Sequence, residues 1–239
     1  MRHLLLCAIG AVAIISTAHA QVSNANPSPV QRRIEAAQKR VQSEPKNAQA
    51  YNDLAFALCR GARDSGDVKL YDEADAALQH SLQLSPGNRE ALKLRVTVLL
   101  GKHQFADALK MASDLQVHNH DDITIWGLLV DANVGLGKLD DAERDAQWIL
   151  DLRSGSSLGF TKAAGLRELF GDPEGAIEFY EEAARRTSQS DLDERAWLIT
   201  QNARLQLKLG NTQRAQALLS EALTLFPNSQ LALTTQTTK

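Results

Sequence analysis

Two histidines and two aspartates lie close together in residues 117–122 (VHNHDD) and could start a metal site. Imidazole nitrogens and carboxylate oxygens are donors that Zn²⁺ uses in proteins, but a complete site needs more ligands than a His-x-His pair supplies. Short matches of this kind also occur by chance in polar loops. We predict no metal ligand here. A metal-dependent protein or enzyme that uses the cluster from His118 to Asp122 stays as an alternative.

Two further segments have the composition of catalytic loops without their spacing. Residues 135–141 (GLGKLDD) lack the G-x-x-x-x-G-K-[ST] pattern of a phosphate loop and follow a predicted helix rather than a strand. Residues 154–159 (SGSSLG) lack the G-x-S-x-G pattern of a nucleophile elbow. The sequence therefore predicts no catalytic residue and no cofactor, and we expect a protein that is not an enzyme.

The surrounding elements repeat at a fixed interval. Residues 170–186 (FGDPEGAIEFYEEAARR) predict a helix that begins at Pro173, with Gly171 in the turn and Asp172 as N-cap. Weaker copies of this segment occur four more times. When the copies are aligned on a small residue, the separations are 34, 34, 34 and 39 residues. The aligned residues are Ala74, Ala108, Ala142, Ala176 and Ala215.

Each of these alanines follows a second apolar run that predicts another helix. One position of that helix is always large and apolar: Tyr51, Leu92, Trp126, Phe160 and Ile199. A second position, four residues later, is always small or slim: Ala55, Val96, Val130, Ala164 and Ala203. Bulk at one position and smallness at the other allow two helices to approach closely.

On these residues the chain resembles the tetratricopeptide-repeat (TPR) family over roughly residues 48–228. The resemblance implies an all-α fold, a right-handed α-solenoid of about five helix-turn-helix units with an N-terminal capping helix. The expected units are residues 47–88, 89–122, 123–156, 157–195 and 196–228. His120, Ser154 and Ser188 stand where the family usually has a terminal proline, which blurs single repeats but leaves the period intact.

The ends of the chain carry other signals. Residues 1–20 have a basic start, an apolar run and an A-x-A site, which predict a secretory signal peptide cleaved after Ala20. We expect an exported protein, periplasmic or secreted. Residues 21–30 predict a flexible linker, residues 31–46 a capping helix, and residues 229–239 a tail. Residues 229–233 of that tail could begin a helix, whereas 234–239 (TTQTTK) are expected to be disordered.

Two insertions interrupt the period. Seven extra residues fall within residues 60–70, and five within residues 189–194. For the first, longer helices with a polar loop near residues 64–67 are the simplest interpretation. Both insertions are expected to be tolerated loop variation, with a protruding contact surface as the alternative.

The resemblance also implies where a ligand would bind, because the first helix of each repeat lines the concave face. Carried over by position, the groove residues are Asn52, Phe56, Lys93, Thr97, Thr124, Asp131, Thr161, Glu168, Trp197, Thr200 and Arg204. Phe56 and Trp197 are the candidate aromatic anchors, with cover by a neighbouring helix as the alternative. Asn52 and Phe56 stand where one subclass has the Lys and Asn of a carboxylate clamp, so that clamp is not expected.

Composition sets limits on the partner. The formal net charge is −3 and no long basic block is present, so we expect no nucleic-acid partner. We expect no transmembrane segment in the mature chain. Cys59, on an apolar helix, is expected to be a small buried side chain. The predicted function is an exported, non-catalytic adaptor that binds a protein or peptide in its groove, with cell-envelope assembly as a suggested setting and self-association as an alternative.

Overall fold

The computed structural model describes residues 28–237, and all regular secondary structure in that range is helical. The predicted signal peptide and most of the predicted linker lie outside the described residues. The helices are α1 (Pro29–Ser43), α2 (Ala48–Ser65), α3 (Lys69–Leu84), α4 (Arg89–Gly101), α5 (Phe105–Gln116), α6 (Ile123–Gly135), α7 (Leu139–Leu152), α8 (Ser157–Leu169), α9 (Pro173–Arg186), α10 (Leu192–Lys208), α11 (Thr212–Leu225) and α12 (Gln230–Thr237).

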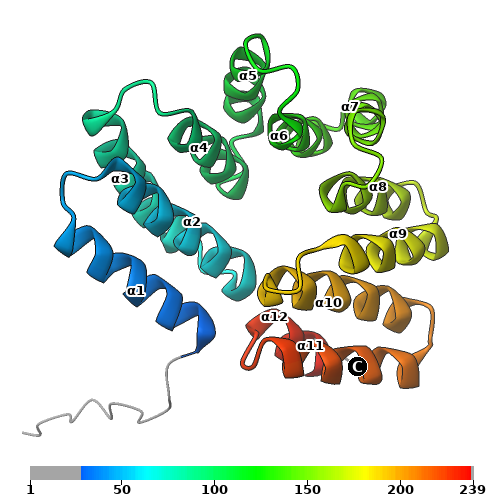
Figure 1. Ribbon diagram of the computed structural model, residues 1–239. Helices are drawn as coiled ribbons and strands as arrows, with labels where there is room; N and C mark the ends of the chain where they lie inside the picture. Colours follow the sequence, from blue (N-terminus) through cyan, green and yellow to red (C-terminus); the bar gives the residue numbers. More distant parts are fainter. Residues whose placement is uncertain (1–27, 238–239) are drawn as a thin grey trace, which may run out of the picture.

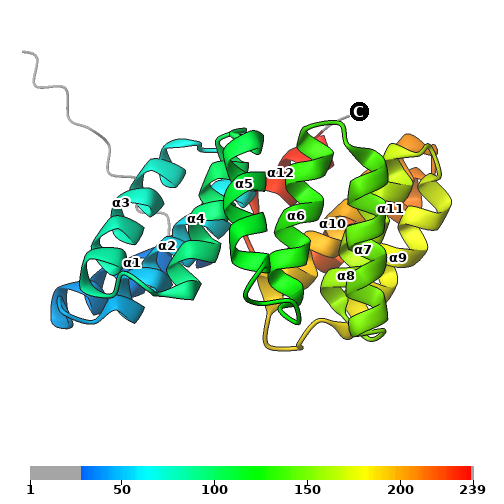
Figure 2. The same ribbon diagram turned by 90° about the horizontal axis from the view of Figure 1, so that it is seen from above.

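The helices follow one another in chain order, and each contacts the next, as predicted for an α-solenoid. The even-numbered helices α2 to α10 form the inner layer of the arc, and the odd-numbered helices α3 to α11 lie outside it (Figure 1). Seen from above in Figure 2, the helices of successive repeats run alongside one another. Within the described residues no helix is both long and apolar enough to cross a membrane.

Helix α9 shows how local sequence sets the repeat. Gly171 has a φ of 79°, a conformation that glycine adopts at little cost. The Asp172 carboxylate accepts the backbone N–H of Gly175 at 2.9 Å and caps the helix. Pro173 occupies the first helical turn, where a missing N–H leaves no broken hydrogen bond. The predicted start of this helix is confirmed.

Small residues form the contacts between helices. The five aligned alanines, Ala74, Ala108, Ala142, Ala176 and Ala215, are all fully buried. The slim residues predicted opposite them on the inner helices are also buried. The predicted phase of the repeat is therefore confirmed, because small side chains lie where two helices are closest.

The C-terminal tail corrects one expectation. Residues 234–237 belong to α12 instead of being disordered, and Thr235 is buried. The hydroxyl of Ser229 accepts the N–H of Ala232 and donates to Asp64 of α2, which anchors the start of the helix. Thr235 satisfies its hydroxyl within the helix by donating to the Leu231 carbonyl at 2.8 Å. A polar tail is thus ordered by its contact with a distant repeat.

At the N-terminus the capping helix is present but begins earlier than predicted. Pro29 and Val30, assigned to the linker from the sequence, form the first turn of α1. Ser28 and Gln31 form a reciprocal capping box, in which each side chain accepts the backbone N–H of the other residue. This capping box fixes the start of the helix before its apolar stripe.

The arc bends until its first and last repeats meet. α12 contacts α2, and Val30 of α1 packs against the C-terminal apolar cluster that includes Ala196, Leu219 and Ala232. Figure 1 shows α1 and α2 beside α10 and α12. The two insertions lie at this junction, since the end of α2 and the start of α10 contact each other there. Arg60 and Arg63 from the first insertion and Glu194 from the second make contacts within the chain.

Candidate functional site

The predicted groove residues divide into three groups by exposure. Phe56 and Thr124 are exposed, and Phe56 is 46% accessible. Seven residues are half-buried: Lys93, Thr97, Asp131, Thr161, Glu168, Trp197 and Arg204. Asn52 and Thr200 are each only 1% exposed, so they do not face the hollow of the arc. A ligand-binding role for the other nine residues stays a prediction.

Asn52 is buried because its position faces the next repeat. Its carboxamide donates to Asn88, the N-cap of α4, and accepts a hydrogen bond of 2.7 Å from Ser81 of α3. Gly127 occupies the equivalent position of α6, and a Cβ there would meet Leu158 and Lys162 of α8. The Thr200 hydroxyl likewise donates a hydrogen bond within the chain, to the Ala196 carbonyl of the same helix. Short side chains at this position therefore contribute to packing between repeats.

Longer charged side chains on the inner layer pair with one another across repeats. Lys93 of α4 donates to Asp122, the N-cap of α6, at 3.1 Å. Lys162 of α8 lies 2.6 Å from Asp131 of α6. Arg204 of α10 binds both carboxylate oxygens of Glu168 on α8, at 2.5 and 2.7 Å. We call these three pairs the inner belt.

Pairing in the inner belt shifts the pKa values of Glu168 and Lys93. Hydrogen bonds from Arg204, with a smaller contribution from Lys208, outweigh the effect of burial and lower the pKa of Glu168 to about 2. Burial opposes the charge of Lys93, but hydrogen bonds to Glu90 and Asp122 outweigh it and raise its pKa. Glu168 and Lys93 are therefore ionised at neutral pH, and each lies next to its counter-ion.

Replacing Glu168 with glutamine is expected to change how stability depends on pH. A carboxyl whose pKa is lowered by folding contributes stability above its unfolded pKa of about 4.3 and loses it as pH falls toward about 2. The difference in unfolding free energy between wild type and Glu168→Gln should be constant from neutral pH down to about 5 and shrink below it. Urea unfolding at several pH values measures this. Glu143→Gln, at an exposed position, is the control. If the difference between wild type and Glu168→Gln did not vary with pH, the lowered pKa of Glu168 would be contradicted.

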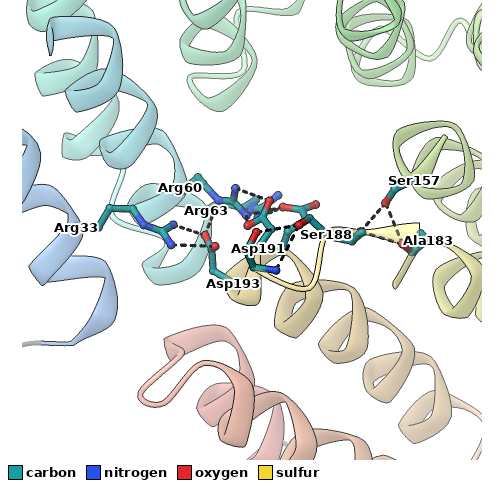
Figure 3. Close-up of polar contacts among 11 residues, drawn as sticks. Arg33, Arg60, Arg63, Ser157, Ala183, Ser188, Asp191 and Asp193 are labelled. Atoms are coloured by element: carbon teal, nitrogen blue, oxygen red, sulfur yellow. Dashed lines mark hydrogen bonds and ion pairs between the residues drawn. The ribbon is translucent and has the colours of Figure 1, made fainter. Parts of the chain in front are cut away.

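The junction between the first and last repeats is a cluster of three arginines and three carboxylates, which we call the seam. The guanidinium of Arg33 on α1 donates to both carboxylate oxygens of Asp193, at 2.6 and 3.1 Å. Arg60 of α2 lies within 3.1 Å of Asp191, Asp193 and Glu194. Arg63 donates to Glu194 at 2.6 Å. Figure 3 shows these arginines pointing from α1 and α2 toward the start of α10.

Among the carboxylates of the seam, Asp193 is held ionised by the arginines. Burial disfavours the charge on Asp193, yet the hydrogen bond from Arg33, the hydrogen bond with Asp191 and the charges of Arg60 and Arg33 lower its pKa to about 2. Burial and the hydrogen bond to Asp193 raise the pKa of the neighbouring Asp191. The arrangement keeps Asp193 and its partner Arg33 charged over the physiological range.

Aromatic rings accompany the arginines. The Arg60 guanidinium carbon lies 5.3 Å from the centre of the Phe56 ring, and that of Arg63 lies 4.7 Å from the centre of the Trp197 ring. Both distances suit a cation–π interaction. Trp197 also meets Tyr180 edge-on, with ring centres 6.3 Å apart. Trp197 is thus partly covered, whereas Phe56 keeps an accessible face.

Next to the seam is a cavity of about 240 Å³. Its walls include residues from α2, α4, α6 and α10, so it lies among four inner helices. Phe56, Tyr71 and Leu94 supply apolar surface, and Arg63, Lys93 and Glu194 supply charge. Cys59 also lines it, and burial raises the pKa of that thiol to about 12, as expected for an inert small side chain. A hollow with apolar walls and a few charges suits a side chain of a bound peptide.

The histidine–aspartate segment is not assembled as a metal site. Asp122 caps α6 by accepting the N–H of Thr124 and is paired with Lys93. His120 contacts Gln116 through Nδ1, and its carbonyl accepts the indole N–H of Trp126. Among residues 28–237, no three His, Cys, Asp or Glu side chains are grouped closely enough to hold a metal ion.

Sequence reasoning missed the seam residues Arg33, Arg60, Arg63, Asp191, Asp193 and Glu194. Their partners are separated by up to 160 residues in the chain, so no local spacing relates them. One signal was available: most of them fall in or next to the two segments that depart from the 34-residue period. Charged residues are frequent in both segments, and this pattern could have suggested that the two segments contact each other.

Comparison with solved structures matches this arrangement to known repeat proteins. A thermophilic TPR protein from Thermus thermophilus aligns with a TM-score of 0.65 and 18% identity, over 79% of this chain and 97% of that one. The chain described here therefore has the TPR fold. A TPR protein from Parabacteroides merdae aligns with a TM-score of 0.66 and 14% identity, over 87% of this chain and 76% of that one.

Other structural similarities are partial or distant. The Cut9–Hcn1 hetero-tetramer of the APC/C gives a TM-score of 0.69 at 17% identity over 88% of this chain, which spans 38% of the matched chain. The type IV pilus biogenesis factor PilW gives a TM-score of 0.53 at 17% identity, over 87% of this chain and 91% of PilW. No family model matches the sequence. No curated protein matches it either.

Proposed function

We propose that this TPR protein is an exported, non-catalytic scaffold that holds a segment of a partner protein against its inner helices. The cavity beside Phe56 is the observation that carries the proposal. An aromatic side chain that is 46% exposed stands in a hollow among four inner helices, where core packing does not require it. Exposed aromatic anchors in concave surfaces are typical of protein-recognition sites.

The charges of the inner layer support a peptide ligand rather than a strongly charged polymer. The inner belt pairs each cation with an anion, so the hollow has polar groups of both signs. Such a surface suits hydrogen bonding to an extended backbone together with one or two apolar side chains. Export rests on the N-terminal sequence, with its basic start, apolar run and A-x-A site. The cell envelope is therefore the compartment in which we expect the partner.

Self-association is less favoured by the arrangement of the ends. Helices α1 and α12 cover apolar surface of the terminal repeats, and the two ends contact each other. A repeat array polymerises most readily when its end units leave an apolar face open. The closed junction thus directs our proposal to a separate partner that binds inside the arc.

Site-specific photocrosslinking tests the proposal. A photoreactive phenylalanine analogue at Phe56 should crosslink a partner in cell-envelope extract, and the same analogue at Trp148 on the outer helix α7 should not. Trp148 is 45% exposed, so it is a matched control for accessibility. With the purified partner, Phe56→Ala should weaken binding by about 30-fold, the usual effect of losing a hot-spot side chain. Equal crosslinking at both positions would contradict an inner binding surface.

A further inference from the structure

The seam differs from the contacts between adjacent repeats in how it is held together. Adjacent repeats share apolar clusters, such as the one that joins Val96, Ala108 and Leu129. Within the described residues, Val30 alone among those of α1 and α2 joins the C-terminal cluster. The remaining contacts of these helices with α10 and α12 named above are ion pairs, hydrogen bonds and the cation–π contact of Arg63 with Trp197. Opening of this junction would therefore break polar contacts and expose little apolar surface.

The acidic segment, residues 191–194 (DLDE), consists of the N-cap and the first residues of α10. Three of its four side chains are carboxylates, and all three contact arginines of α1 or α2. Arg60 and Arg63 are each placed over an aromatic ring, which holds the guanidinium groups in fixed orientations. Asp193 is bound by two nitrogens of Arg33, the paired geometry that guanidinium groups use to recognise carboxylates.

From this geometry we propose that Arg33, Arg60 and Arg63 form a binding site for an acidic peptide, and that the acidic segment occupies it in the free protein. This inference rests on the proposed function and names the chemistry of one class of partner. The partner segment carries two or three carboxylates within about four residues, spaced like those of the acidic segment. It displaces residues 191–194 and places a neighbouring apolar side chain in the cavity beside Phe56.

The acidic segment and an external acidic peptide would compete for the same arginines, and this competition sets the expected affinity for the peptide. A site that is free only part of the time binds an external ligand more weakly, in proportion to the free fraction. Neutralising the acidic segment should therefore increase affinity for an acidic peptide, whereas neutralising the arginines should abolish it. Because the contacts are ionic and partly exposed, binding should also weaken as salt concentration rises.

The test uses a fluorescein-labelled peptide with the sequence of residues 188–195 (SQSDLDER), followed by fluorescence anisotropy. The protein variant Asp191→Asn/Asp193→Asn/Glu194→Gln should bind it at least about tenfold more tightly than wild type, from the change in free fraction. The charge-matched control, Asp140→Asn/Glu143→Gln/Asp151→Asn, changes the exposed face of α7 by the same amount and should bind like wild type. Circular dichroism checks that all variants keep their helices.

Two further arms identify the site. Adding Arg60→Gln and Arg63→Gln to the neutralised variant should remove binding, and the peptide SQSNLNQR should not bind any variant. If the neutralised variant binds no better than the charge-matched control, or if the amide peptide binds equally well, the inference is wrong. The crosslink at Phe56 is a separate result, so the scaffold proposal can hold even if this inference is wrong. Failure of the scaffold proposal would appear instead as equal crosslinking at Phe56 and Trp148.

Discussion

Replacing Leu198 with alanine is expected to lower the free energy of unfolding by about 2–5 kcal/mol, because the cavity left by a buried leucine collapses only in part. Leu198 is fully buried on α10, in the apolar cluster with Tyr180 and Leu205. Its neighbours on α9 are held by the solenoid and have little freedom to fill the space. Urea unfolding followed by circular dichroism gives the change.

Leu169→Ala is the matched control for this change. Leu169 is 53% exposed at the end of α8, so removal of its side chain should change stability by no more than about 0.5 kcal/mol. Equal losses for Leu198→Ala and Leu169→Ala would mean that α10 is not packed into the stack. Such a result would remove the physical basis of the repeat-on-repeat core described above.

The second large effect is expected from enlarging the small residues between helices. Ala142→Leu and Ala176→Leu should each cost about 1–3 kcal/mol, because both sites are fully buried and the added methylenes have no space. Ala106→Leu is the control, since Ala106 lies on α5 only two residues from buried Ala108 but is exposed. Thermal unfolding of the three variants measures the effect; unchanged stability at both buried sites would mean that the alignment of the repeats is wrong.

The sequence predicted those features that depend on nearest neighbours. The 34-residue step located the buried alanines, because each repeat packs on the next in the same way. Turn and capping residues such as Gly171 and Asp172 located the start of α9 to the residue. The polar loop predicted near residues 64–67 is also present: α2 ends at Ser65 and Gly66 takes a left-handed conformation.

Features that depend on the whole arc could not be predicted in this way. The small rotation from each repeat to the next adds up along the chain, and the sum decides whether the ends meet. A single repeat does not encode this sum in any residue, so the pairing of Arg60 with Asp193 was not foreseen. The order in the polar helix α12 follows from the same closure, since Asp64 holds its first turn.

The candidate groove was predicted in outline only. Phe56 is exposed as expected, while Asn52 is buried between repeats because a short side chain at its position reaches only the next helix. The position of a residue in the repeat fixes the direction of its side chain. The length of that side chain then decides whether its polar end reaches the hollow of the arc. Lys93 illustrates the long case, since its ammonium group extends to Asp122.

Closure of the arc is the central claim, and a crosslinking measurement tests it most directly. In a chain without its native cysteines (Cys7→Ala, Cys59→Ala), new cysteines would replace Asp64 and Ser229, whose side chains lie 2.6 Å apart although 165 residues separate them. A short bis-maleimide reagent should join this pair within one molecule, and should not join cysteines at Asp64 and the exposed Gln213 of α11. Absence of the intramolecular product for the 64–229 pair, in protein that retains its helical circular dichroism, would show that the ends do not meet.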